Sequence, residues 1–143
     1  MKLGMILLPV LLLSTIMLAS CGTNAAESAL VDKVWVLETY GEPNNLKSVL
    51  QDTEITATFN SDERNVTGSA GCNSYFGDYE VKGNNLSIPG PIAATEMACP
   101  EPEGVLEQES QYLRILKSAE SYQIQDNELR INCGDEVLTY TAE

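Results

Sequence analysis

The stretch that decides the fold is GSAGCNSYFGDYEVKGNNLSI, residues 68–88. Within it, residues 74–81 alternate with the period of two that is typical of a β-strand. Residues 83–85, Gly-Asn-Asn, follow, and both residue types tolerate the positive φ that tight hairpin turns require. Residues 86–88 then return as a partner strand. The stretch predicts an antiparallel hairpin that is preceded by a cysteine, Cys72.

The segments on either side of this hairpin also favour antiparallel β structure. Turn-forming residues separate short runs that are rich in β-branched, aromatic or alternating apolar residues. Residues 46–50 are expected to form a short helical turn or a loop. The clearest further strands are expected at residues 34–40, 54–59, 121–125, 128–132 and 136–141.

One segment, residues 103–118, predicts a helix. Pro100 and Pro102 precede it, as expected at a helix entry, and Arg114 and Lys117 near its end suit the helix dipole. One face would point to the core and carry Val105, Glu109, Tyr112 and Leu116, with Leu106 and Leu113 at its flanks. The predicted fold class is α+β and mainly antiparallel β: a compact, barrel-like sheet of about eight short strands with one packed helix.

Composition and charge exclude several classes of function. The chain has 143 residues, which suits one domain, and its 8 Lys+Arg against 21 Asp+Glu give a net charge of −13. Such a charge argues against nucleic-acid binding. The sequence contains no histidine, which excludes Ser-His-Asp and Cys-His mechanisms and the usual His-containing metal sets. No cofactor is expected.

The N-terminus resembles a bacterial lipoprotein signal. An apolar run at residues 3–19 follows Lys2, and Leu18-Ala19-Ser20-Cys21 resembles a lipobox. The resemblance implies that the chain is cleaved after Ser20 and that Cys21 is acylated. The alternative is an uncleaved membrane helix, but the run is at the short limit for spanning a bilayer and contains Pro9.

Three parts of the chain follow from this signal. They are a lipoprotein signal peptide at residues 1–20, a lipidated tether at residues 21–29 and one folded domain at residues 30–143. Acyl chains on Cys21 would supply the membrane affinity. The expected location is the cell membrane or the outer membrane, lipid-anchored on the exported side, facing the periplasm or the cell surface.

Two ordered motifs resemble those of a known family. The first is Gly71-Cys72-Asn73 with Gly77, Tyr79, Gly83 and Leu86, and the second is Thr95-Glu96-Met97-Ala98-Cys99-Pro100. With Trp35 in the first strand, these residues resemble the META domain family, also called HslJ-like, over roughly residues 30–141. The resemblance implies a compact, mainly antiparallel β fold with one helix packed on it. It supplies no catalytic activity; members are often lipoproteins or exported, and they are loosely associated with stress and antibiotic tolerance.

Three cysteines remain beyond the lipobox, and the pairings 72–99, 72–133 and 99–133 are all open. Because Cys72 and Cys99 lie in the family motifs, the resemblance favours a disulfide between them, in the oxidising compartment that export provides. Cys133 matches no motif, and its phase with its strand predicts a buried, unpaired thiol. A catalytic Cys72 is disfavoured, since a nucleophilic thiolate needs a neighbouring base or cation. Asn73 is expected to be a turn residue whose side chain bonds nearby backbone.

Other side chains are weaker candidates. An acidic zone around the helix entry could bind calcium or magnesium, but no EF-hand spacing is present, so a solvated surface and no metal are expected. Aromatic residues could form a binding patch, although their spacing along strands favours the core. Trp35 is expected to face the core beside the helix. The acidic zone comprises Glu96, Glu101, Glu103, Glu107 and Glu109, and the aromatic candidates are Tyr75, Phe76, Tyr79 and Tyr122.

Two functions remain open. The favoured one is a non-enzymatic envelope lipoprotein: a binding or interaction module linked to envelope stress or antibiotic tolerance. Its partners would be the membrane, through the lipid on Cys21, and an unidentified envelope protein or small ligand. The alternative is a small carboxylate-dependent envelope hydrolase. Two carboxylates facing each other about 5–10 Å apart in a cleft would favour the hydrolase.

Overall fold

One antiparallel sheet and two helices make up residues 25–143, the residues that the computed structural model describes. The expectations for the signal peptide and for Cys21 lie outside these residues. The elements in chain order are α1 (Ala25–Leu30), β1 (Val34–Glu42), β2 (Asn45–Ser48), β3 (Thr56–Asn60), β4 (Asn65–Ser69), β5 (Ser74–Asp78), β6 (Glu80–Lys82), β7 (Asn85–Ser87), β8 (Ala93–Ala94), α2 (Val105–Lys117), β9 (Ser121–Gln125), β10 (Glu128–Cys133) and β11 (Glu136–Ala142).

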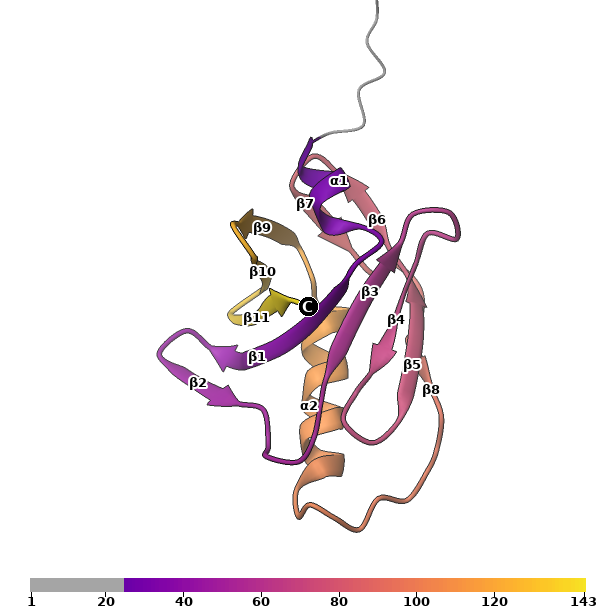
Figure 1. Cartoon of the computed structure of the whole chain (residues 1–143), viewed down its shortest axis with the longest axis vertical. Coiled ribbons are helices and arrows are strands. Elements are labelled where there is room, and N and C mark those ends of the chain that lie inside the picture. The colour runs from indigo at the N-terminus through magenta and orange to yellow at the C-terminus, as the bar shows by residue number, and fades with distance from the viewer. Residues whose placement is uncertain (1–24) are drawn as a thin grey trace, which may run out of the picture.

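The sheet curls into a half-barrel around α2 (Figure 1). Its strand order is β6-β7-β9-β10-β11-β1-β3-β4-β5-β8, and β2 pairs with β1 at the side. Only Tyr79 separates β5 from β6, so one stretch of chain connects the first strand of this order to the strand next to its other end. The predicted fold class, α+β with a mainly antiparallel sheet, is confirmed. The described residues contain eleven strands and two helices rather than about eight strands and one helix.

Alternating burial explains why the strands form where the sequence predicts them. In β3, β5 and β10 every second residue is buried, which is the pattern of a sheet with one face on the core. On α2 the predicted core face is confirmed, because Val105, Glu109, Tyr112 and Leu116 are all buried. The predicted aromatic patch is mostly core: Tyr75, Tyr79 and Tyr122 are buried and only Phe76 is exposed.

Three buried tyrosine hydroxyls connect both sides of the curled sheet to α2. Tyr75 donates to the carbonyl of Thr56 at 2.8 Å, Tyr75 and Tyr112 are 2.7 Å apart, and Tyr112 and Tyr140 are 3.1 Å apart. Because a hydroxyl has one hydrogen, Tyr112 must donate to Tyr75, and Tyr140 to Tyr112. Burial raises the pKa of all three hydroxyls well above the usual value, so they remain protonated donors.

Two elements differ from the sequence-based expectation. Residues 25–29, expected to belong to the tether, form most of α1, whose last residue, Leu30, is fully buried. Residues 46–50, expected to be a helical turn or a loop, instead contribute most of β2, which pairs with β1 across a short turn. Every residue of β2 is exposed, so it lacks the alternation of apolar residues that would have indicated a strand.

Trp35 is buried, as predicted, but its polar partner is unexpected. Its indole N–H donates to the carbonyl of Leu30 at 2.9 Å, so the Trp35 ring is fixed against α1. The sequence predicts that Trp35 faces the core beside the helix at residues 103–118, and its burial in the core is confirmed. Val34 and Val36 are half-buried on the other face of β1, as the period of two requires.

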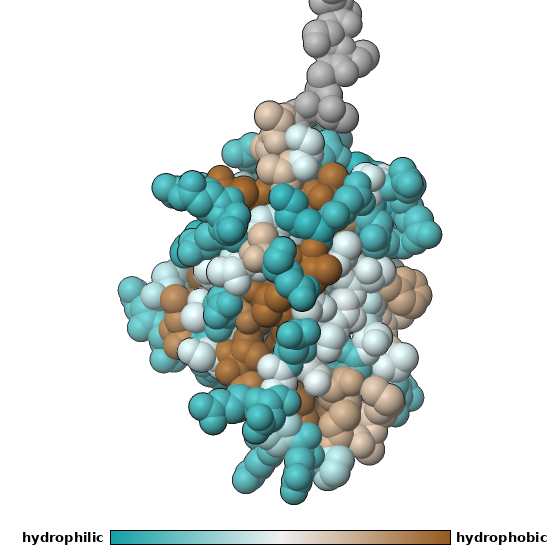
Figure 2. Space-filling view, viewed as in Figure 1, coloured by the Kyte–Doolittle hydropathy of each residue, from teal (hydrophilic) through white to brown (hydrophobic). Residues whose placement is uncertain are grey.

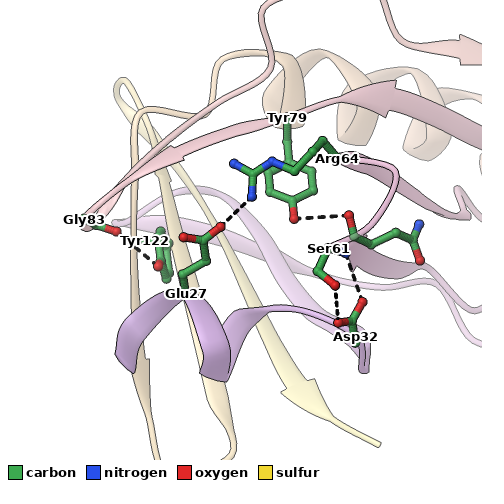
Figure 3. Close-up of polar contacts among 8 residues, drawn as sticks. Glu27, Asp32, Ser61, Arg64, Tyr79, Gly83 and Tyr122 are labelled. Carbon is green, nitrogen blue, oxygen red and sulfur yellow. Dashed lines mark hydrogen bonds and ion pairs between the residues drawn. The ribbon is translucent and has the colours of Figure 1, made fainter. Parts of the chain in front are cut away.

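Polar contacts fix α1 to the turn between β3 and β4 (Figure 3). Arg64 forms an ion pair with Glu27 at 2.5 Å, and its guanidinium lies 5.0 Å from the centre of the Tyr79 ring. At the end of the helix, Asp32 accepts hydrogen bonds from the backbone N–H and the hydroxyl of Ser61, at 3.0 and 2.6 Å. These bonds lower the pKa of Asp32. The helix and the residues that follow it are therefore both attached to the turn between β3 and β4.

Candidate functional site

A disulfide joins Cys72 and Cys99, whose Cα atoms lie 6.0 Å apart, so the preferred pairing is confirmed. Within residues 25–143 the remaining cysteine, Cys133, is unpaired and buried, again as predicted. Burial, with Glu136 nearby, raises the pKa of its thiol to about 12, which keeps it in the unreactive protonated form. The cysteine chemistry of the described residues is therefore structural.

A buried amide–carboxylate pair lies beside this disulfide. Asn73 donates from its backbone N–H to Glu109 Oε2 and from its side-chain Nδ2 to Glu109 Oε1, both at 2.7 Å. Its Oδ1 accepts bonds from the hydroxyl of Thr95 at 2.9 Å and from the backbone N–H of Met97 at 2.7 Å. The expectation that Asn73 bonds nearby backbone is wrong, since all these partners are distant in sequence. Asn73 instead connects α2 to the chain that follows β8.

The backbone conformation and the surroundings of Gly71 explain why the first residue of the Gly-Cys-Asn motif is a glycine. Gly71 has a φ of 106°, and an added Cβ would lie 3.2 Å from the side-chain nitrogen of Gln108. Gln108 is itself buried and bonds the backbone N–H of Leu50 at 2.7 Å and the hydroxyl of Thr53 at 3.1 Å. Two adjacent polar residues on the core side of α2 thus fix two different loops.

The disulfide and the hydrogen bonds of Asn73 hold an exposed segment in place, residues 93–104, here called the tethered segment. It begins as β8, where Ala93 pairs with Phe76 and Ala94 pairs with Tyr75. It then runs through the disulfide to the start of α2, and most of its side chains are exposed. Met97 within it and Phe76 beside it are 56% and 57% exposed, the largest values among the exposed large apolar side chains of residues 25–143.

Two hollows adjoin the tethered segment. The larger, about 650 Å³, is lined by two prolines and three exposed acids: Pro100, Pro102, Asp52, Glu101 and Glu103. The smaller, about 200 Å³, lies at the junction of β5 and β8 and is more apolar; it is lined by Ser74, Tyr75, Phe76, Ala94 and Thr95. The two hollows therefore offer different chemistry on one exposed segment.

The acidic zone predicted from the sequence is divided by the fold. Glu109 is buried against Asn73, whereas the other four members are exposed: Glu96, Glu101, Glu103 and Glu107. In the part of the chain that the structure describes, no three acidic, cysteine or histidine side chains are grouped so that they could hold a metal ion. The sequence places Glu109 on one face of the helix with Tyr112, but the role of its carboxylate was not predicted. Its signal was a charged residue on the core face of an amphipathic helix, which requires a buried partner.

The comparisons with known proteins agree with this geometry. The sequence model of the META domain family matches residues 28–143. This chain belongs to the META domain family. Among curated proteins, none matches the sequence significantly. The Gly-Cys-Asn motif and the second cysteine of this META domain thus have a structural role here, as parts of the disulfide and the Asn73–Glu109 pair.

Solved structures share the fold of this META domain. A protein from Burkholderia xenovorans, solved by NMR, is 28% identical, with a TM-score of 0.67 over 81% of this chain and 85% of that one. A second NMR structure is 26% identical, with a TM-score of 0.58 over 80% and 92%. A DUF4847 family protein from Bacteroides vulgatus is similar in fold alone, with 17% identity and a TM-score of 0.55 over 80% and 95%.

The described helices lack the length and hydropathy that a membrane-spanning helix requires. Neither α1 nor α2 is long and apolar enough to cross a bilayer, and no other helix occurs in residues 25–143. The two helices instead pack on the sheet through buried residues, such as Leu30 in α1 and Tyr112 in α2.

Proposed function

We propose that this META domain is a non-enzymatic interaction module that a lipid on Cys21 holds in the cell envelope, with a role in envelope stress or antibiotic tolerance. The observation that carries the binding part is the combination of the disulfide with the buried Asn73–Glu109 pair. Both fix an exposed segment rather than line a cleft. A segment that is ordered before binding loses less conformational entropy when a partner binds. Exposed loops on a rigid scaffold are also where binding residues concentrate.

The hydrolase alternative receives less support. A glycosidase-type mechanism pairs one carboxyl group in apolar surroundings with another in polar surroundings. The three carboxylates that line the larger hollow are all exposed. Among residues 25–143 the one buried carboxylate, Glu109, has both oxygens hydrogen-bonded to Asn73. A group occupied in this way is not available as a general acid or base.

The anchoring part of the proposal is supported by the lipobox and by the shape of the domain. Helix α1, which follows the lipobox region, lies at one end of the long axis, and the loop between β8 and α2 lies at the other (Figure 1). A lipid on Cys21 would therefore attach at the α1 end. The tethered segment would then face away from the membrane, toward partners.

Two experiments test the two parts separately. Metabolic labelling with palmitate should mark the wild-type chain and place it in the membrane fraction, whereas Cys21→Ser should be unlabelled and remain uncleaved. Equal labelling of the two proteins would overturn the anchoring. Affinity capture from envelope extracts should retain partners with the wild type that a Cys72→Ala/Cys99→Ala protein loses. Equal capture by both proteins would overturn the assignment of binding to the tethered segment.

A further inference from the structure

The sheet has an open edge at β8. β8 is the last strand in the sheet order, and within residues 25–143 only β5 pairs with it. The N–H of Thr95 points inward and donates to the carbonyl of Ser74 at 3.0 Å. In an antiparallel ladder, successive residues direct their N–H and C=O groups to opposite sides. The backbone N–H and C=O of Ala94 therefore point outward, where another strand could pair with them.

This edge lacks some of the features that usually prevent pairing with another chain. Edge strands are normally protected by being very short, or by charged side chains, proline or bulges. β8 is short, and Pro91 and Glu96 lie on either side of it, but both of its residues are exposed alanines and residues 92–95 carry neither a charge nor a proline. The disulfide at Cys99 and the bond from the N–H of Met97 to Asn73 hold the chain beyond the strand in place. At Ala93 and Ala94 the edge thus carries no side chain that would block pairing, and the chain beyond it is fixed.

An apolar hollow lies next to this edge. Its volume of about 200 Å³ is below the roughly 300–1,000 Å³ of sites that hold whole small molecules. It is large enough for one aliphatic side chain, and the exposed ring of Phe76 forms part of its wall. A strand that paired with β8 could place an alternate side chain into this hollow, as in other modes of strand addition.

The charge around the edge indicates which charged side chains a partner strand would need. From residue 83 to residue 113 the sequence contains no lysine or arginine, but it contains five glutamates: Glu96, Glu101, Glu103, Glu107 and Glu109. Four of them are exposed, and they lie along or close to the tethered segment. A partner with lysine or arginine at its ends would complement this surface. A second copy of this acidic chain would bring like charges together.

We propose that β8 binds an extended peptide segment of a partner protein as an added strand. One apolar side chain of the peptide occupies the hollow beside Phe76, and basic residues flank it. This inference rests on the proposed function, because it names the partner class of the same interaction module. It assigns affinity to the outward backbone groups of Ala94 and specificity to the hollow and to the acidic surroundings.

The test uses the full-length chain in detergent and a fluorescent peptide, Lys-Arg-Thr-Val-Leu-Val-Thr-Arg-Lys. Binding is measured by anisotropy. The Ala94→Pro change removes an outward N–H that the fold does not use, and it should weaken binding at least about tenfold. Phe76→Ser should weaken it by about five- to tenfold. Leu46→Ser, which changes an exposed leucine on β2, is the matched control and should leave binding unchanged.

Three further measurements keep the outcomes distinct. A peptide of the same sequence with alternate backbone nitrogens methylated, and a peptide with glutamate in place of each basic residue, should both fail to bind. Equal binding of the methylated peptide, or wild-type affinity of Ala94→Pro, would overturn strand addition. Sedimentation that showed a wild-type dimer, lost in Ala94→Pro, would identify a second copy as the occupant and overturn the basic peptide. Failure of the peptide to bind the wild type would overturn this inference alone, since palmitate labelling and envelope capture test the proposed function independently.

Discussion

Replacing Glu109 by glutamine should reduce the free energy of unfolding by about 2–3 kcal/mol. In the wild type, each carboxylate oxygen accepts one 2.7 Å hydrogen bond from Asn73, one from the backbone N–H and one from Nδ2. Glutamine keeps one oxygen and replaces the other by an amide nitrogen, so one donor of Asn73 then faces another donor. A buried unpaired donor costs about 1–3 kcal/mol, and the remaining bond loses its charge assistance. Relief from burying a charge offsets part of this loss.

The assay is urea unfolding of the oxidised protein, followed by the fluorescence of Trp35. Glu107→Gln is the matched control, because Glu107 lies on the same helix, carries the same charge and is exposed. The control should change the free energy of unfolding by no more than about 0.5 kcal/mol. Hydrogen exchange gives a local readout: the amide of Met97, which donates to Asn73, should exchange faster in Glu109→Gln. If the two variants are equally stable, the carboxylate does not hold the tethered segment.

Three further predictions concern the core. Trp35→Ala should cost about 3–5 kcal/mol in a urea melt followed by circular dichroism, because the variant lacks the single tryptophan and leaves a cavity and an unpaired carbonyl at the end of α1; a loss below about 1 kcal/mol would contradict the burial of the ring. Gly68→Ala should lower the free energy of unfolding by at least about 1–3 kcal/mol, because its Cβ would overlap the backbone carbonyl of Thr56. Gly90→Ala is the control, because its Cβ would meet nothing closer than 3.9 Å, and thermal melts of the two variants should show only Gly68→Ala to be destabilised. The buried Cys133 thiol, with its pKa of about 12, should resist iodoacetamide at pH 8 until urea unfolds the chain. The thiol loses its proton near pH 9 in the unfolded chain and near pH 12 in the folded chain, so the folded state binds this proton more tightly. The contribution of the Cys133 thiol to the free energy of unfolding should therefore be full below pH 9 and fall as the pH rises from about 9 to 12, which a pH series of urea melts would detect. Rapid labelling of the native protein would instead show that the thiol is exposed.

Periodicity was enough to predict most of the sheet and the core face of α2. These elements bury one face, and burial leaves a regular trace in the sequence, as in β10 and at Tyr112. Helix α1 left no such trace, because a six-residue helix with one fully buried residue is too short for a period to appear. The exposed strand β2 carries no apolar alternation either, since its formation depends on pairing with β1.

The candidate site was predictable in its covalent part and not in its polar part. The family resemblance identified Cys72 and Cys99, whose pairing can be read from motifs. The partner of Asn73 could not be found in this way, because Glu109 is distant in sequence and only the tertiary fold brings the two together. The open edge at β8 is likewise a property of the strand order, which the local pattern around Ala93 and Ala94 does not determine.

The buried tyrosine hydroxyls give the far wall of the core an influence on the binding edge. Tyr112 lies one turn of α2 beyond Glu109, so the hydroxyls that orient Tyr112 also set the rotation of the helix that presents Glu109. Tyr140 on β11 is the outermost donor of this series. Removing its hydroxyl would leave the buried oxygen of Tyr112 without its donor. A change on β11 would thus reach, through Tyr112, the same helix that presents Glu109 to Asn73.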